Sequence, residues 1–229
     1  VARNTTSLAA TVMEIDVNEY TDPEQFQREK SELFRNYPQF VGPSCIVPEA
    51  GDYFAFDDTG VPILIVRQGD GGLRAFVNIC SHRGAPLNEC DHGKAKKGRL
   101  FACPYHGWTF DRAGACVRMP AENTNARQLQ RAGVTAYCVE ELGGLIFAYL
   151  GPAPAPLLPR YDLFLWEGVL RDVGRAELPC NWLQIMENSV DPVHVEYLHG
   201  HHLQAQLGQD SSASPYSRRH EKIGFDLFE

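Results

Sequence analysis

The sequence lacks several features that would place the protein in a particular class. It has no run of about eighteen apolar residues, the length that a membrane-spanning helix needs. The N-terminal stretch VARNTTSLAATVMEIDVNEY lacks the basic and then apolar profile of a secretory signal peptide. The basic residues form no long block and the formal net charge is −8, so no electrostatic field attracts nucleic acids or anionic membranes. We therefore expect a cytoplasmic protein that binds neither nucleic acid nor membrane.

The cysteines do not fit a disulfide framework. There are 7 of them, an odd number spread over a chain of 229 residues, which is typical of reduced thiols or metal ligands. What the chain does have is apolar content, 44% of its residues, enough to bury a substantial core. We expect one large folded domain or two smaller ones.

The first predicted element is a helix over residues 22–35. The stretch TDPEQFQREKSELFRNYPQF opens with Thr21, has Pro23 at an early helical position, and has Glu24 three residues after Thr21. Phe26 and Leu33 then lie on roughly one helical face. These signals together predict a helix that begins near Asp22.

Residues 39–150 predict a small antiparallel β domain. Short β-rich runs (YFAF, VPILIVRQ, LRAFVNIC, RLFAC, WTFD, VTAYCVEE and LIFAYL) alternate with turn signals such as DDTG, GDGG, DRAG and LGG. The proline-rich GPAPAPLLPRYD fits neither helix nor sheet and marks a boundary. We predict an N-terminal segment over 1–38, a β domain over 39–152, and a second domain over 153–229. In the latter, GRAELP and RRHEKIGFDLFE indicate strands and CNWLQIMENSV a helix.

Two loops of the β domain each carry one cysteine and one histidine. These are Cys80-x-His82 and Cys103-x-x-His106, each between a strand and a turn signal. Two such loops at the tip of a sheet can hold four ligands around a metal centre. Tetrahedral zinc is chemically possible, but zinc sites usually pair cysteine with cysteine and histidine with histidine. A [2Fe–2S] cluster with two cysteines on one iron and two histidines on the other requires this mixture.

With these motifs, CSHRGAPL and CPYHGWTFD, the β domain resembles a Rieske domain. The resemblance implies that Cys80 and Cys103 bind the inner iron through sulfur. It implies that His82 and His106 bind the more exposed iron and form the exit for an electron. Neutral imidazole ligands make such a cluster easier to reduce, with potentials of roughly −150 to +300 mV.

The resemblance favours the low-potential, oxygenase-like branch of Rieske proteins. The respiratory branch has an additional disulfide between the two cluster loops, and this chain has Ala85 and Tyr105 at those positions. Cys90 and His92 lie between the two motifs, and we expect them to be structural or solvated rather than ligands. The same holds for the remaining cysteines, which are Cys45, Cys116, Cys138 and Cys180.

A second group of potential ligands lies in MENSVDPVHVEYLH. A solvated surface helix would explain one histidine, but here His194 and His199 follow Asp191. Five residues turn an ideal α-helix through about 500°, so the two imidazoles would diverge by about 140°. They converge only if the helix is distorted. Pro192, which lacks an N–H and clashes with the carbonyl of Asn188, predicts a kink or π-type bulge there.

Two histidines and one carboxylate around Fe(II), with open positions, form the facial triad of non-haem iron oxygenases. The stretch resembles the mononuclear-iron motif of the Rieske non-haem iron oxygenases, and NWLQ…ENSVDPVHVEYLHG is most similar to their phthalate-dioxygenase-like branch. The resemblance implies that His194 and His199 bind iron. It implies that Asp191 bridges an iron-ligand histidine and His106 of a neighbouring subunit, and that Asn188 lies near the iron.

The third ligand of the family is a carboxylate far downstream of the second histidine. The carboxylates that follow His199 are Asp210, Glu221, Asp226 and Glu229, none at that distance. We therefore assign no third ligand, and KIGFDLFE indicates the first strand of a catalytic domain. The neighbouring histidines are expected to be solvated: His201, His202 and His220.

The resemblance implies an α+β fold, with an antiparallel β-sandwich Rieske domain followed by the start of a helix-grip (START-like) catalytic domain. The expected function is that of a homotrimeric or homohexameric terminal oxygenase. It would use a [2Fe–2S] cluster, mononuclear Fe(II), O2, and electrons from NAD(P)H through a separate reductase or ferredoxin. It would hydroxylate or demethylate an aromatic or similar organic substrate. The alternatives are a Rieske-type electron carrier and a zinc-stabilised interaction module.

Overall fold

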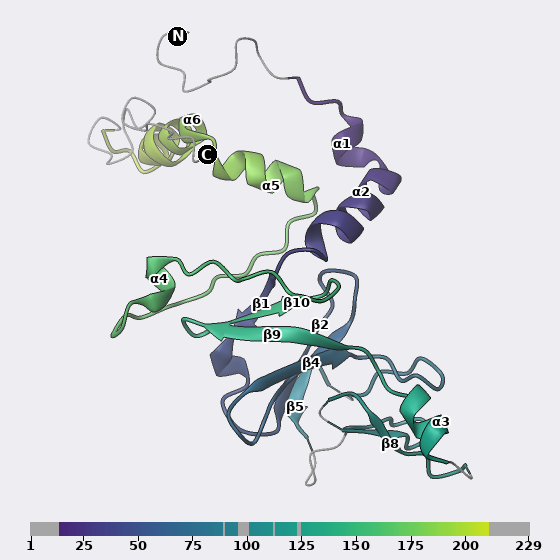
Figure 1. Ribbon diagram of the computed structural model, residues 1–229. Helices are drawn as coiled ribbons and strands as arrows, with labels where there is room; N and C mark the ends of the chain where they lie inside the picture. Colours follow the sequence, from purple (N-terminus) through teal and green to yellow (C-terminus); the bar gives the residue numbers. More distant parts are fainter. Residues whose placement is uncertain (1–13, 89, 96–100, 112, 123–124, 211–229) are drawn as a thin grey trace. The chain divides into compact units, whose positions relative to one another are not determined.

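The structure is a computed structural model that describes residues 14–88, 90–95, 101–111, 113–122 and 125–210. Its chain divides into two compact units (Figure 1). One unit is Phe26–Gly174; the other combines Val1–Gln25 with Arg175–Glu229. The division therefore lies after Gly174, whereas the proline-rich stretch predicted a boundary after residue 152.

The predicted N-terminal helix is present. After the short α1 (Asn18–Thr21), α2 (Pro23–Glu29) continues into one π-helical turn, η1 (Lys30–Phe34). The cap differs from the expectation, because an Asp22 side-chain oxygen accepts the Glu24 N–H at 2.9 Å. The Thr21 hydroxyl instead donates to the carbonyl of Val17, the residue before α1.

The β unit is built on one large antiparallel sheet of seven strands in the order β1-β10-β9-β4-β3-β2-β5 (Figure 1). A second sheet has the order β6-β7-β8, with the helix α3 (Ala126–Arg131) next to β8. The bounds are β1 (Gln39–Pro43), β2 (Asp52–Phe56), β3 (Ile63–Arg67), β4 (Leu73–Val77), β5 (His92–Lys94), β6 (Phe101–Ala102), β7 (Thr109–Phe110), β8 (Cys116–Arg118), β9 (Ala136–Leu142) and β10 (Leu145–Tyr149). The runs predicted as strands correspond to β2, β3, β4, β6, β7, β9 and β10, which confirms the antiparallel β domain.

Strand β3 supplies both faces of the large sheet with core residues. Because successive side chains of a strand point to opposite faces, Ile63 and Ile65 enter one apolar cluster and Leu64 and Val66 enter another. The second cluster also contains Phe76, Phe101 and Phe110, together with Cys80, Cys103 and Trp108. The two cysteine–histidine loops are therefore attached to the hydrophobic core.

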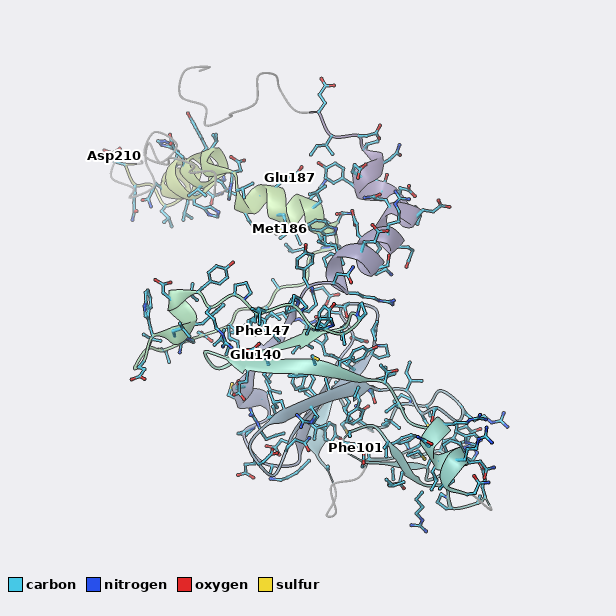
Figure 2. The ribbon with its side chains drawn as sticks, in the orientation of Figure 1. Phe101, Glu140, Phe147, Met186, Glu187 and Asp210 are labelled. Carbon is cyan, nitrogen blue, oxygen red and sulfur yellow. The ribbon has the colours of Figure 1, made fainter. Side chains whose placement is uncertain are left out.

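The segment after β10 packs on the β unit, which explains why the unit extends to Gly174. Leu158 is buried, and Arg160 pairs with Glu140 at 2.5 Å. The ring of Phe164, in α4 (Asp162–Leu165), lies 5.9 Å from that of Phe147 in an edge-to-face arrangement. Glu140 and Phe147 are both labelled in Figure 2. Proline-rich composition predicted a linker, but Leu158, Arg160 and Phe164 pack this segment on the β unit.

One ion pair of the sheet makes stability depend on pH. Arg67 donates from Nη1 to a Glu141 carboxylate oxygen at 2.5 Å and from Nε to the Val47 carbonyl. The hydrogen bond from Arg67 holds the pKa of Glu141 below its ordinary value. A lowered carboxyl pKa contributes stability above the unfolded-state pKa, and that contribution is lost as pH falls through the folded-state value.

We expect Glu141→Gln to lower the free energy of unfolding near neutral pH by a few tenths to about 1 kcal/mol, because the carboxylate is partly exposed. The difference from wild type should disappear at an acidic pH below the lowered folded-state pKa of Glu141, where the wild-type carboxyl is protonated and, like glutamine, uncharged. Urea unfolding at both pH values measures it, with Glu140→Gln as the control for an exposed pair. A difference that stays constant with pH would show that ionisation of Glu141 does not contribute to stability.

The other unit is helical in its described part. It contains α5 (Trp182–Ser189), α6 (Pro192–His194), the π-helix η3 (Val195–His202) and α7 (Leu203–Gln206). The Tyr20 hydroxyl of α1 donates to the Glu187 carboxylate at 2.6 Å, and the Asn181 amide donates to the Tyr20 carbonyl. Glu187 and its neighbour Met186 are labelled on α5 in Figure 2.

The predicted helix in CNWLQIMENSV is confirmed by α5, but GRAELP forms no strand. The predicted strand in RRHEKIGFDLFE, and with it the start of a helix-grip sheet, lies outside the described residues. Among the residues that the structure describes, no helix is long and apolar enough to cross a membrane.

Candidate metal centres

The two cysteine–histidine loops have the same backbone turn. In the loop after β4, the Cys80 N–H donates to the Ala85 carbonyl at 2.8 Å, and the Gly84 N–H donates to the Cys80 carbonyl at 2.9 Å. In the loop between β6 and β7, the Cys103 N–H donates to the Trp108 carbonyl and the Gly107 N–H to the Cys103 carbonyl, at the same two distances. Each cysteine thus begins an equivalent turn.

A glycine makes each turn possible. Gly84 has φ +74° and Gly107 has φ +70°, a conformation that favours glycine. Sequence reasoning missed this equivalence, although a signal was present: both glycines follow their cysteine by four residues, whereas the histidines follow by two and by three. The different histidine spacing therefore places His82 and His106 at different points of the same turn.

A buried asparagine also fixes the first loop, and sequence reasoning did not single it out. The Asn78 side-chain oxygen accepts the Leu87 N–H at 3.0 Å, and its amide donates to the Asn88 side chain at 2.5 Å. Asn88 in turn donates to the Cys90 carbonyl. Cys90 is exposed and His92 lies in β5, so neither belongs to the group formed by Cys80 and His82.

Cys80 and Cys103 are free thiols, and each is only 2% exposed. Burial raises the pKa of the Cys80 thiol, the adjacent Cys103 thiol raises it further, and the His82 backbone N–H lowers it. Two neighbouring thiols in an apolar core ionise together only if a cation compensates their charge. This arrangement therefore suits a metal that binds both sulfur atoms.

The two histidines of the loops lie side by side. Their ring centroids are 4.7 Å apart and the rings are inclined by 66°. Nδ1 of His82 is buried and has no hydrogen-bond partner. Because an unpaired buried nitrogen is costly, this atom is suited to bind a metal.

Within the described ranges, no three histidine, cysteine or acidic side chains converge on one ion. A [2Fe–2S] cluster needs no such group, because each of its irons takes only two protein ligands. Cys80 and Cys103 form one pair and His82 and His106 the other, with one member of each pair from each loop. The residues therefore fit a [2Fe–2S] cluster better than a single zinc ion.

The second group of predicted ligands lies on a distorted helix, as expected from the sequence. The rings of His194 and His199 are 5.4 Å apart and inclined by 73°. They converge because η3 is a π-helix, whose i→i+5 hydrogen bonding places residues five apart above one another. The interpretation of Pro192 needs a correction: it does not kink a continuous helix but is the first residue of α6.

Asp191 organises the start of α6. One of its carboxylate oxygens accepts the N–H groups of Val193 at 2.8 Å and His194 at 3.2 Å, as a helix cap does. Its backbone carbonyl lies 2.5 Å from Nδ1 of His194. A proton on Nδ1 donates to that carbonyl and leaves Nε2 free to bind a metal.

The mononuclear site is incomplete in the described part of the chain. His194 and His199 supply two imidazoles, and no carboxylate there joins them. Asn188 is exposed at the end of α5. The bridging role of Asp191 and the role of Asn188 remain predictions.

Comparison with known proteins identifies the domain that contains the two cysteine–histidine loops. The family model of the Rieske [2Fe-2S] domain matches residues 38–138, which include both cysteine–histidine loops. The 5,5'-dehydrodivanillate O-demethylase oxygenase subunit of Sphingobium sp. is 38% identical over 169 residues, covering 72% of this chain and 38% of the relative. The chain contains a Rieske [2Fe-2S] domain and is similar to the oxygenase subunits of Rieske oxygenases.

Other Rieske oxygenases extend the match. The phthalate 4,5-dioxygenase oxygenase subunit of Pseudomonas putida is 34% identical over 143 residues, covering 61% of this chain and 31% of the relative. A structure of naphthalene 1,2-dioxygenase with indole bound in the active site has a TM-score of 0.67 and 29% identity. The match covers 83% of this chain and 46% of the naphthalene dioxygenase chain. The chain therefore spans less than half the length of these relatives.

These matches confirm the α+β class and the Rieske domain that the sequence predicted. The Rieske domain uses a [2Fe–2S] cluster, and Rieske oxygenases also use a mononuclear iron with electrons from a reductase.

Proposed function

We propose that the chain is part of a terminal oxygenase that takes electrons from NAD(P)H through a reductase or ferredoxin and uses O2 to hydroxylate or demethylate an organic substrate. The observation that carries this proposal is the convergence of His194 and His199 on a π-helix. An electron carrier needs only the Rieske domain. A second pair of imidazoles, with Nε2 of His194 left free, is useful only if a second metal binds.

The four loop residues would hold the [2Fe–2S] cluster. Cys80 and Cys103 are buried and adjacent, so they suit the inner iron. His82 and His106 suit the outer iron, and His106 is exposed. The exposed imidazole is the natural exit for an electron, because it brings a ligand to the surface of the domain.

His194, at the end of α6, and His199, in η3, would hold Fe(II). When bound, the iron supplies the activation of dioxygen, and the cluster supplies single electrons. The protein's own contribution is orientation: the Asp191 carbonyl fixes the His194 ring, and the Asp191 carboxylate fixes the first turn of α6. In a homotrimer or homohexamer, Asp191 of one copy would connect its iron-ligand histidine to His106 of a neighbouring copy.

The substrate class follows from the relatives. Their names give O-demethylation of 5,5'-dehydrodivanillate, dioxygenation of phthalate and benzene, and monooxygenation of glycine betaine. We propose an aromatic or similar small organic substrate. A cytoplasmic location would give such an oxygenase access to NAD(P)H.

The metal content of the chain, after anaerobic reconstitution with Fe(II) and sulfide, tests this proposal. We expect about three irons and about two sulfides per chain, with two of the irons in the cluster. His199→Ala should remove one iron and leave the sulfide unchanged. His202→Ala, at a neighbouring histidine that contacts Gln206 instead, is the matched control and should keep all three.

Equal iron content in wild type and His199→Ala, at about two per chain, would contradict the oxygenase and favour an electron carrier. A colourless protein that binds zinc would contradict both. If the iron content supports the oxygenase, oxygen uptake that depends on an added aromatic substrate would test the reaction itself.

A further inference from the structure

Four aromatic rings form a continuous row through the two cluster loops. The indole of Trp108 stacks on the imidazole of His82 at 4.5 Å with an inclination of only 7°. His82 contacts His106, and His106 contacts the ring of Tyr105 at 3.9 Å. The row begins in the core, where Trp108 is 9% exposed, and ends at the surface, where Tyr105 is 66% exposed.

Trp108 connects the two loops. Its carbonyl accepts the Cys103 N–H and so closes the second loop. Its side chain, however, covers the histidine of the first loop. The same residue also belongs to the apolar cluster that contains Cys80 and Cys103. Trp108 therefore fixes one loop through its backbone and the other loop through its ring.

The stacking fixes the orientation of His82. A nearly parallel indole leaves the imidazole little freedom to rotate, because rotation would separate the two faces. In this orientation Nδ1 of His82 is buried without a partner, although burial of such an atom is unfavourable. The contact with Trp108 thus maintains the arrangement that a metal ligand needs before the metal is bound.

The two histidines consequently have different environments. His82 has an indole on one face and is half-buried, whereas His106 is exposed and its aromatic neighbour is itself at the surface. Water reaches the second imidazole but is excluded from one whole face of the first.

We propose that Trp108 is a positioning residue that holds His82 in its ligating orientation and shields it from water, so that His106 is the ligand that communicates with the outside. This inference rests on the proposed cluster ligands. It goes beyond them, because it assigns a function to a residue that binds no metal and explains why the two histidines are not equivalent.

The shielding has a measurable electrostatic consequence. With two thiolates and two neutral imidazoles, the oxidised cluster unit has no net charge, and one added electron makes it an anion. A dry environment disfavours the charged state, so removal of the indole and entry of water should favour the reduced state. The midpoint potential should therefore rise.

The test compares the reduction potential and the persistence of the visible cluster absorbance in the purified, cluster-containing chain. Trp108→Leu should raise the potential and bleach about two- to tenfold faster than wild type, the factor expected for loss of one aromatic pair. Trp108→Phe should shift both readouts in the same direction but less. Phe101→Leu is the matched control, since Phe101 lies in the same apolar cluster and its ring packs against those of Tyr53 and Phe76.

An unchanged potential in Trp108→Leu, or an equal rise in Phe101→Leu, would overturn the proposal in favour of general core packing. If Trp108→Leu does not fold, Trp108→Phe against Phe101→Leu decides, and equal shifts would again overturn it. A wild-type chain without a cluster would instead refute the proposed function, so the two failures are distinguishable.

Discussion

Replacement of His82 by cysteine is expected to lower the midpoint potential of the cluster by on the order of hundreds of mV, towards the value of about −400 mV that four-cysteine clusters show. The reason is charge: a thiolate replaces a neutral imidazole, so the reduced state becomes more negative and harder to form. A physiological donor would then no longer reduce the cluster, and electron delivery should be lost. A redox titration followed by visible absorbance measures the shift.

His92→Cys is the matched control for this substitution. His92 lies in β5, in the same connection between the two motifs, and is exposed. It should leave the potential unchanged. An unchanged potential in His82→Cys as well would show that His82 is not a ligand.

Asp191→Asn is expected to slow electron transfer to the mononuclear iron by about ten- to hundredfold, the usual effect of losing a partner of a metal ligand. Asparagine still accepts the Val193 and His194 N–H groups, so the cap of α6 should survive and both metals should stay bound. Only the charge is removed. The readout is the rate at which the pre-reduced cluster is reoxidised after mixing with O2.

Asp191→Ala separates the two roles of the side chain. It should be as slow as Asp191→Asn, and it should in addition lose about 0.5–2 kcal/mol of stability, because the cap is lost. Reoxidation at the wild-type rate in Asp191→Asn would show that Asp191 does not connect the two metal sites and acts only as a helix cap.

The cluster loops were predictable because their chemistry is local. Each motif places a cysteine and a histidine within four residues, between a strand and a turn, so spacing alone brings Cys80 near His82 and Cys103 near His106. Sequence alone did not show that the two loops repeat one backbone turn. That equivalence depends on the positive φ of Gly84 and Gly107, and glycine occurs in many turns.

The distortion near the second motif was predicted as a kink or a π-type bulge, and the π-type alternative is the one that occurs, although Pro192 does not kink the helix. Five-residue spacing excludes convergence of His194 and His199 on a regular α-helix. Whether a proline bends a helix or begins one depends on the residue before it. Here Asp191 caps the new helix, and the distortion follows as a π-helix after Pro192.

Some features of the fold depend on tertiary contacts, and sequence patterns therefore did not predict them. Strand β1 contains Gly42 and Pro43, a composition that resembles a turn. Among the described residues it pairs only with β10, and the register shifts between Phe40 and Gly42. Strand β5 is a short polar strand that depends on β2 for its pairing. The stacking of Trp108 on His82 joins residues from two loops, and no local pattern indicates it.

Cys80, Cys103, His82 and His106 are proposed to hold the [2Fe–2S] cluster, and electron spin-echo envelope modulation of the reduced protein detects imidazole nitrogens bound to it. The predicted result is coupling to two imidazole nitrogens, with one lost in His82→Cys and the other in His106→Cys. A reduced cluster without nitrogen coupling, or with coupling that survives both substitutions, would contradict the account.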